Sequence, residues 1–252
     1  MKTKIIAIVL LLSGCSSQPL FYNEFLPPKD SKQVTIEVDV PQGYEIRPLN
    51  VMYRSDKCKV NRRVSEREYR DVPGFHNMEI LLNQQGNTSI FAKEIPITGG
   101  GRCDWRLSNV TASLDFSKNH PLAHTAKTFI GRSLIFIFDT NSPKRSGGYI
   151  NKVKGNLIIS KKHFPKINKN SINNKLVLTL LGGNLYEYYD VSQPQKIQWK
   201  PIVRNNIYVM TEYSGNAEKD KKGKQVKYSD GTVSQGDTDD EMYKKLLSMM
   251  EK

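Results

Sequence analysis

The chain of 252 residues has few of the residues that usually mark a catalytic or metal centre. It contains four histidines, three cysteines and two tryptophans, and no two cysteines have Cys-x-x-Cys spacing. No apolar run approaches the ~20 residues that a membrane-spanning helix requires. No repeat of fixed period is present. These absences disfavour a thiol-redox site, a helical membrane protein and a repeat architecture.

Motifs of the common hydrolases and nucleotide-binding proteins are also missing. The string nearest to a nucleophile elbow, at 131–135, lacks the second glycine and runs into a strand, whereas an elbow turns into a helix. The glycines at 99–101 are followed by Cys103-Asp104-Trp105, while a P-loop requires Gly-Lys-Ser/Thr. Glycine more often permits a tight turn, and we expect that role here.

Two of the histidines, His120 and His124, have the spacing of a zinc-binding helix. Pro121 follows the first, and the glutamate that would act as general base is absent. Turn or surface positions are the ordinary interpretation of such histidines. The sequence therefore predicts a protein that is not an enzyme and that has no cofactor and no metal site. An unrecognised hydrolase that uses His120 or His124 is one alternative.

The N-terminus, in contrast, carries a clear targeting signal. Lys2 and Lys4 precede an apolar run over 5–12, which ends in Leu12-Ser13-Gly14-Cys15. A basic start, a short apolar core and a small-residue end are typical of a secretory signal peptide. The final four residues resemble the lipobox of bacterial lipoproteins, in which the cysteine becomes the lipidated first residue of the mature chain.

The resemblance to lipoproteins implies that residues 1–14 are removed and that Cys15 anchors the chain in a membrane. Ser16 after the cysteine, in place of Asp, implies the periplasmic face of the outer membrane. Each buried acyl CH2 contributes about 0.8 kcal/mol, so several acyl chains hold a protein stably. An ordinary secretory signal beside a chance cysteine is the alternative.

Export changes how the remaining cysteines and the charge are interpreted. Cys58 and Cys103 are expected to pair in an oxidising compartment, closing a loop of about 46 residues worth about 4 kcal/mol in the chain-entropy model. The formal net charge is +13, or +11 once Lys2 and Lys4 leave with the signal peptide. An envelope location disfavours a nucleic-acid partner and leaves anionic lipid or an acidic protein.

The periodicity of the mature chain is predominantly that of β-strands. Val34, Ile36 and Val38 alternate with polar residues, as in a half-buried strand, and the apolar run 133–138 predicts a central strand buried on both faces. Gly182-Gly183-Asn184 between two apolar runs predicts a hairpin. The remaining strands are predicted at 44–53, 78–82, 89–95, 105–116, 176–181, 185–191, 197–203 and 207–210. The fold class is therefore mainly β, either an antiparallel sandwich-like domain or two small β-subdomains, with a short C-terminal α-helix.

Composition divides the chain into five segments. After the signal peptide at 1–14, residues 15–30 carry three prolines and are predicted to be a tether. Residues 31–210 form the β-rich binding domain, and any subdivision is expected near 141–149, where Ser-Pro and Gly-Gly interrupt the pattern. Residues 211–238 contain few apolar residues and are predicted to be a mobile polar linker. Residues 239–252 are predicted to be an amphipathic helix whose acidic first turn suits the helix dipole.

Basic residues concentrate at 56–73, inside the loop that the disulfide would close. We expect this segment to be loop-rich, with one or two turns of helix at 64–70, and loops carry many binding residues. Arg62, Arg63 and Arg67 are therefore candidate partner contacts. Acidic residues are interspersed with them, so a solvated face is the alternative interpretation.

Three tyrosines, Tyr186, Tyr188 and Tyr189, follow the predicted hairpin turn. At least one of them must face outward because neighbouring strand residues point to opposite faces. Tyrosine is enriched at recognition surfaces, so all three are candidate partner contacts.

The lipobox, the motif Gly-Gly-Gly-Arg-Cys-Asp-Trp-Arg-Leu-Ser at 99–108 and the paired Cys58 are together similar to periplasmic immunity lipoproteins. Such proteins accompany lipase or phospholipase effectors of type VI secretion. The resemblance implies a protein that docks on an incoming lipase, covers its cleft or locks its lid, and so protects the cell's own phospholipids. A structural or assembly lipoprotein of the outer membrane or of a secretion apparatus is the alternative.

Overall fold

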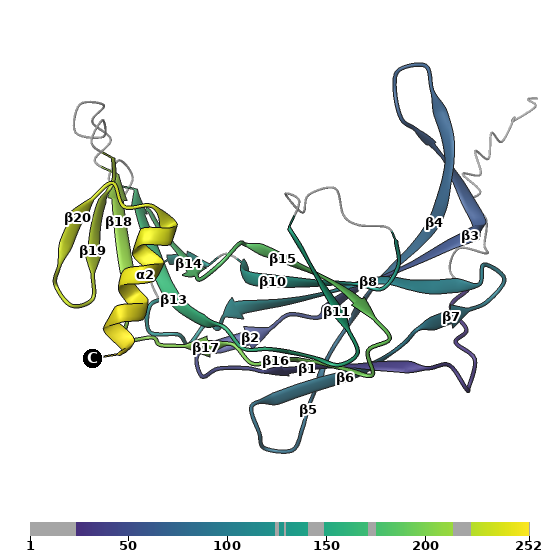
Figure 1. Cartoon of the computed structure of the whole chain (residues 1–252), viewed down its shortest axis with the longest axis horizontal. Coiled ribbons are helices and arrows are strands. Elements are labelled where there is room, and N and C mark those ends of the chain that lie inside the picture. The colour runs from purple at the N-terminus through teal and green to yellow at the C-terminus, as the bar shows by residue number, and fades with distance from the viewer. Residues whose placement is uncertain are drawn as a thin grey trace, which may run out of the picture.

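The structure is a computed structural model that describes residues 24–123, 126–128, 130–140, 149–170, 175–213 and 223–251. Within these ranges the chain forms three β-sheets and one α-helix (Figure 1). The predicted mainly β, sandwich-like fold is confirmed. The signal peptide, Cys15, His124 and the predicted subdivision at 141–148 lie outside the described residues.

The first sheet has five strands, and its central strand shows the predicted alternation. Val34, Ile36 and Val38 are buried, while the residues between them are partly exposed. The strand order is β12 (Leu157–Ile159), β16 (Lys196–Trp199), β1 (Gln33–Asp39), β6 (Ile90–Pro96) and β5 (Asn83–Gln84). Strand β1 runs antiparallel to β6 but parallel to β16, so the sheet is mixed rather than purely antiparallel.

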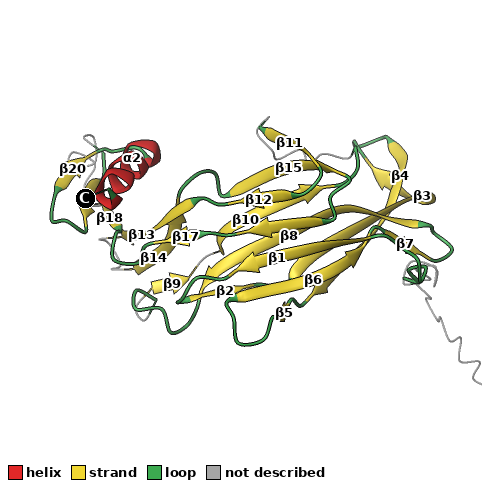
Figure 2. Ribbon diagram, turned by 60° about the horizontal axis from the view of Figure 1, so that its bottom comes forward, coloured by secondary structure: helices red, strands yellow, loops and turns green. Residues whose placement is uncertain are grey.

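The second sheet has eight strands and packs against the first (Figure 2). Its path is β11 (Ile150–Lys154), β15 (Tyr186–Ser192), β10 (Ile130–Ile137), β8 (Trp105–Phe116), β3 (Leu49–Arg63) and β4 (Tyr69–Ile80), with β2 (Tyr44–Ile46) and β7 (Thr98–Gly100) beside β8. Residues 131–137 of β10 are all buried, as predicted for a central strand. The two sheets share one core, in which Trp105 and Phe136 of this sheet join Ile36 and Trp199 of the other.

The third sheet contains β20 (Val233–Gln235), β19 (Gln225–Tyr228), β18 (Val209–Tyr213), β13 (Lys162–Asn170), β14 (Lys175–Leu181) and β9 (Ala126–Thr128), with β17 (Ile202–Val203) beside β13. Helix α2 (Asp239–Met250) packs on it through the buried Met242 and Leu246. Figure 1 places this sheet and α2 at the opposite end of the molecule from the β3–β4 hairpin.

The C-terminal helix is present as predicted, but the linker prediction for 211–238 is wrong over much of its length. Strand β18 continues to Tyr213, and β19 and β20 extend the third sheet beyond it. Val226 and Tyr228 alternate with exposed residues and reach the core of the third sheet. Two apolar residues in a charged segment are enough for a short strand when a sheet edge offers backbone hydrogen bonds.

The hairpin predicted at Gly182-Gly183-Asn184 is also wrong. Strand β14 pairs with β13 and β9, whereas β15 pairs with β10 and β11, so this turn carries the chain from the third sheet to the second. Gly182 and Gly183 have φ of 130° and 95°, a region that favours glycine. Arg132 Nη1 of β10 donates to Gly183 O at 2.7 Å and fixes the turn in place.

Candidate interaction site at the disulfide end

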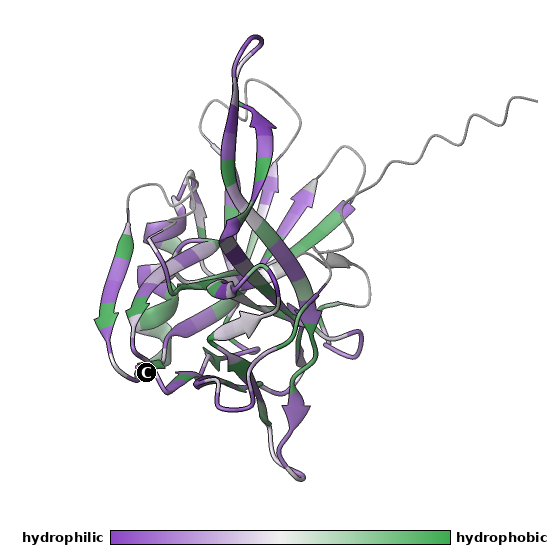
Figure 3. Ribbon diagram, turned by 90° about the vertical axis from the view of Figure 1, so that its right-hand side faces the viewer, coloured by the Kyte–Doolittle hydropathy of each residue, from purple (hydrophilic) through white to green (hydrophobic). Residues whose placement is uncertain are grey.

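The β3–β4 hairpin extends past the sheet to which it belongs. Strand β3 pairs with β8 as far as Arg54, and beyond that point residues 59–63 pair, among the described strands, with 69–73 of β4 alone. We call residues 59–73 the arm. It projects from the body in Figures 1 and 3, and its ribbon is mostly hydrophilic in Figure 3.

The arm corrects the prediction of a loop-rich segment with a helical turn at 64–70. Residues 64–68 instead form the turn that joins two strands, closed by a hydrogen bond from Val64 N to Glu68 O at 2.9 Å. Arg63 stabilises the same turn, since its Nε donates to Ser65 O and its Nη2 to Glu66 O, both at 2.9 Å. Arg63 is exposed, and it also holds the turn in its conformation.

The base of the arm is fastened by the predicted disulfide. Cys58 is bonded to Cys103, with the two Cα atoms 5.2 Å apart. The pairing register shifts between Ser55 and Lys59, as at a bulge that bends a strand. The buried Ser55 hydroxyl accepts from Cys58 N at 2.8 Å and donates to Cys103 O. The bulge and the turn around Cys103 are thus held together by covalent and hydrogen bonds.

One face of the arm carries an unfavourable pair of like charges. Arg62 lies directly opposite Arg70 in the ladder, and Val60 lies opposite Val72 on the same face. Like charges in directly opposed positions destabilise a β-ribbon. Arg70 has an ion pair with Glu68, whereas Arg62 makes no ion pair with any residue that the structure describes.

The tip of the arm combines exposed apolar and cationic side chains. Val64 is 48% exposed and Tyr69 is 61% exposed. Arg67 lies between them in the sequence, is exposed, and has no side-chain hydrogen bond within the described part of the chain. Tyrosine and arginine are among the residues most enriched where binding energy concentrates in protein interfaces.

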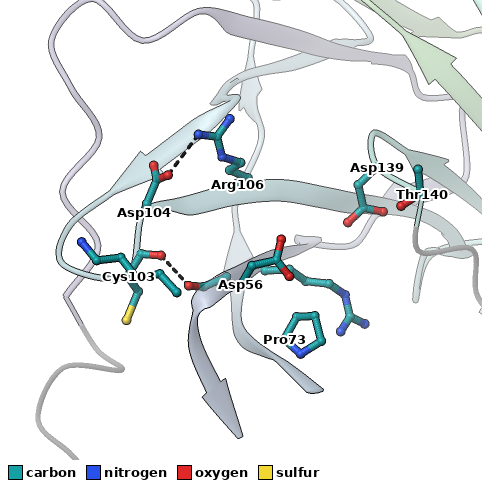
Figure 4. Close-up of a pocket in the computed structure, with 10 residues that line it drawn as sticks. Asp56, Pro73, Cys103, Asp104, Arg106, Asp139 and Thr140 are labelled. Atoms are coloured by element: carbon teal, nitrogen blue, oxygen red, sulfur yellow. Dashed lines mark hydrogen bonds and ion pairs between the residues drawn. The ribbon is translucent and has the colours of Figure 1, made fainter. Parts of the chain in front are cut away.

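A pocket of about 510 Å³ lies beside the base of the arm (Figure 4). Three cationic and three acidic side chains contribute to its wall, and Arg106 Nη2 is 3.0 Å from Asp104 Oδ2. The lining residues are Arg54, Ser55, Asp56, Lys57, Pro73, Cys103, Asp104, Arg106, Asp139 and Thr140. Because the charges balance, the pocket selects no single sign of ligand charge, and it suits polar groups of a partner better than an apolar ligand.

Residues 24–28, within the predicted tether, lie against the body next to this base. Leu26 N donates to Gly99 O at 2.9 Å, and Trp105 Nε1 donates to Glu24 O at 3.1 Å. The Phe25 ring lies 4.8 Å from the ring of Tyr53 between centroids. The prediction of a tether over 15–30 is therefore wrong for residues 24–28, which we call the docked segment.

The glycines at 99–101 make this contact possible. Gly100 has φ of 60°, and a Cβ atom there would collide with Leu26 O. A Cβ on Gly101 would meet Glu24 O at 2.6 Å. The expectation that these glycines permit a tight turn is confirmed, and they also leave room for the backbone of the docked segment.

Only one of the three tyrosines predicted as partner contacts is exposed. Tyr188 and Tyr189 are buried, and Tyr189 Oη donates to Glu187 Oε2 at 3.0 Å, so both were wrongly assigned to the surface. Tyr186 is 44% exposed.

Tyr186 does not join the arm. It pairs with Ser133, which pairs with Ser113 of β8, whereas the arm starts beyond Arg106 of the same strand. Ser113 and Arg106 are seven residues apart along β8, which corresponds to about 23 Å. The structure therefore brings Arg62, Arg63 and Arg67 together on the arm and leaves the tyrosines elsewhere.

His120 is a core residue rather than a surface residue. It is fully buried, its ring lies 4.9 Å from that of Phe116 and 5.2 Å from that of Tyr44, and its Nδ1 accepts from Leu122 N at 3.1 Å. Burial lowers the pKa of His120. Among the residues that the structure describes, no group of three His, Cys, Asp or Glu side chains could hold a metal ion. None of the described helices has the length and apolar character to span a membrane.

Sequence reasoning missed a buried polar cluster where the second and third sheets meet. Glu187 accepts from Lys161 Nζ at 2.5 Å and from Tyr189, while Arg132 reaches the turn at Gly183. Burial, together with the cations Arg132 and Lys161, lowers the pKa of His163 to about 3. These residues come from β10, β15, β13 and the loop before β13, far apart in the sequence, so no local motif predicts the cluster.

The chain was compared with protein-family models, with curated proteins and with solved structures, and it matches none of them significantly.

Proposed function

We propose that this chain is a lipid-anchored protein of the bacterial envelope that uses the arm to bind and neutralise a secreted lipase or phospholipase. The observation that supports a binding role is the arm itself. It is a narrow ribbon, two strands about 5 Å apart, that projects from the body and fits a cleft better than a flat surface.

The fastening of the arm favours binding as its role. A two-stranded ribbon is at best marginally stable in water without further support. The Cys58–Cys103 disulfide and the Ser55 hydrogen bonds supply that support at its base. A ribbon that is already ordered loses less conformational entropy on binding, which increases affinity.

The composition of the tip suits the cleft of a lipase. A cleft that accepts acyl chains is apolar, and Val64 and Tyr69 offer exposed apolar surface at the tip. Arg62 has no ion pair within the described part of the chain and faces Arg70, so an acidic group at the rim of the cleft would relieve their repulsion. The lipid anchor inferred at Cys15 would hold the inhibitor in the layer where a lipase meets its substrate, which raises the effective concentration of the inhibitor.

The test is retention and inhibition of a secreted lipase effector encoded beside this chain. The purified mature protein is expected to retain the lipase on a column and to abolish its hydrolysis of phospholipid vesicles at a one-to-one ratio. Failure to retain any such lipase contradicts the lipase assignment. Capture of secretion-apparatus components in its place would support the structural or assembly alternative.

A matched pair of variants tests the arm. In the first, residues 61–71 are replaced by Asn-Gly, which makes a two-residue hairpin between Val60 and Val72 and keeps the disulfide. In the control, the exposed Tyr186 is changed to Ala. The shortened arm is expected to weaken lipase binding by roughly 100-fold or more, and Tyr186→Ala to leave it unchanged. Full affinity in the shortened variant contradicts the role of the arm.

A further inference from the structure

The docked segment and the arm are attached to the same corner of the fold. Trp105 Nε1 donates a hydrogen bond to Glu24 O of the docked segment. Cys103, two residues before Trp105, forms the disulfide with Cys58 at the base of the arm. Arg102 N, between the glycines and Cys103, donates to Glu24 Oε2 at 3.3 Å. The orientation of the docked segment therefore fixes the orientation of the arm.

The docked segment also shortens the connection to the inferred anchor. Residues 15–23, nine in all, precede Glu24, and fully extended they reach about 30 Å. Without docking, the first firm attachment would be Ser31, whose Oγ donates to Thr98 O at 3.1 Å. Sixteen residues would then span up to about 55 Å, and the body would turn freely on them.

We propose that the docked segment orients the anchored protein, so that the disulfide end and the arm lie toward the bilayer and the α2 end lies away from it. The partner that the arm meets is then a protein already bound at the membrane surface. This inference rests on the lipid anchor of the proposed function. Figure 1 places the third sheet and α2 at the far end from the arm, so the two ends are distinguishable.

The charge of the arm is compatible with this orientation. It carries five cationic side chains and three acidic ones, so an anionic bilayer surface attracts the arm. The opposite orientation would require residues 15–23, which reach about 30 Å, to pass the whole of β8, which starts at Trp105 beside the docked segment and is about 40 Å long by itself.

The test measures energy transfer from two labelled positions to acceptor dyes on lipid headgroups. The lipidated protein is reconstituted in vesicles of phosphatidylethanolamine and phosphatidylglycerol. The donor is attached to a single added cysteine, Glu66→Cys in the turn of the arm or Lys244→Cys on the exposed face of α2. Energy transfer from a donor at position 66 is expected to be severalfold more efficient than transfer from a donor at position 244. Equal transfer from the two positions, or stronger transfer from 244, overturns the proposal.

Two further variants test the docked segment itself. Gly100→Val places a side chain where Leu26 O lies and is expected to release the segment. A ten-residue Gly-Ser insertion after Ser17 keeps the contacts but lengthens the connection, and it provides the test if Gly100→Val fails to fold. Both are expected to bring the two transfer efficiencies closer together, and an unchanged difference in the insertion variant overturns the proposal.

Controls separate this inference from the proposed function. Mass spectrometry of the N-terminal peptide establishes whether Cys15 carries lipid. Lipase retention in detergent solution, where no bilayer is present, reports on the arm alone. Retention without oriented transfer contradicts only the orientation, and oriented transfer without retention contradicts only the lipase assignment.

Discussion

Cys58 and Cys103, whose Cα atoms are 5.2 Å apart, join the base of the arm to the turn that follows Gly99–Gly101. The bond closes a loop of 45 residues in sequence separation, and that loop contains the whole arm. One covalent link therefore supports both the hairpin that projects and the turn that holds the docked segment.

Removal of this link is expected to lower stability and loosen the arm. The double variant Cys58→Ser, Cys103→Ser should lose about 4 kcal/mol in the free energy of unfolding, because the unfolded chain regains the entropy of an open loop. Urea titration followed by tryptophan fluorescence measures the loss. Trypsin should cut faster after Arg62, Arg63 and Arg67 than in the wild type.

Chemical reduction of the wild-type protein should reproduce the effect of the double variant. An unchanged urea midpoint together with an unchanged rate of tryptic cleavage would show that the hydrogen bonds of Ser55 alone hold the arm.

Substitution of Arg62 by Ala is expected to separate binding from stability. Removing one of two opposed arginines relieves repulsion, so the unfolding free energy should stay constant or rise by a few tenths of a kcal/mol. Lipase affinity should fall by about tenfold or more, since the substitution removes an exposed cation from the proposed interface. Isothermal titration calorimetry and urea titration measure the two effects.

Arg47→Ala is the matched control for this prediction. Arg47 has an ion pair with Asp115 at 2.5 Å and lies outside the arm, so its loss should reduce stability without reducing lipase affinity. If Arg62→Ala destabilises the protein and leaves affinity unchanged, Arg62 has a structural role only.

The β-rich fold and its central strand could be predicted from the sequence because local alternation records burial. Val34, Ile36 and Val38 alternate along β1, and the apolar run of β10 lies between two other strands. Pairing partners do not appear in such patterns. Gly182 and Gly183 join strands of different sheets, although the same residues suit a hairpin equally well.

Part of the candidate site could also be predicted from the sequence. The cysteine pair followed from the inferred compartment and the cysteine count, and the exposure of Arg62, Arg63 and Arg67 followed from their charge. The ribbon shape of the arm could not be predicted, because both of its faces are exposed and apolar and polar residues therefore alternate only weakly along it. The docked segment is held by backbone hydrogen bonds of Glu24 and Leu26 and by the single Phe25 ring, and these contacts leave no periodic pattern in the sequence.

The last thirty residues are expected to be essential for folding, in contrast to a linker with an appended helix. Leu246 is fully buried in the core of the third sheet, so Leu246→Ala should cost about 2 to 5 kcal/mol. The neighbouring Leu247 is only partly buried, and Leu247→Ala should cost clearly less. Thermal unfolding followed by circular dichroism compares the two, and equal effects would contradict the packing of α2 described above.

Stability is expected to fall as the pH falls from about 7.5 to 5. Burial and two nearby cations lower the pKa of His163 to about 3, whereas an unfolded histidine titrates near 6.5. The unfolded state therefore binds a proton first, and the stabilisation present above pH 6.5 is lost as the pH falls toward 3. This residue alone should account for about 2 kcal/mol between pH 7.5 and pH 5.

The buried His120, whose pKa burial also lowers, acts in the same direction. Urea titrations at several pH values measure the dependence. His163→Gln removes the titrating group and should flatten the slope between pH 5 and 7.5 whatever its effect on absolute stability. His120→Gln should remove a separate part of the slope. A wild-type protein whose unfolding free energy is constant across this range would show that His163 is protonated at similar pH in the folded and unfolded states.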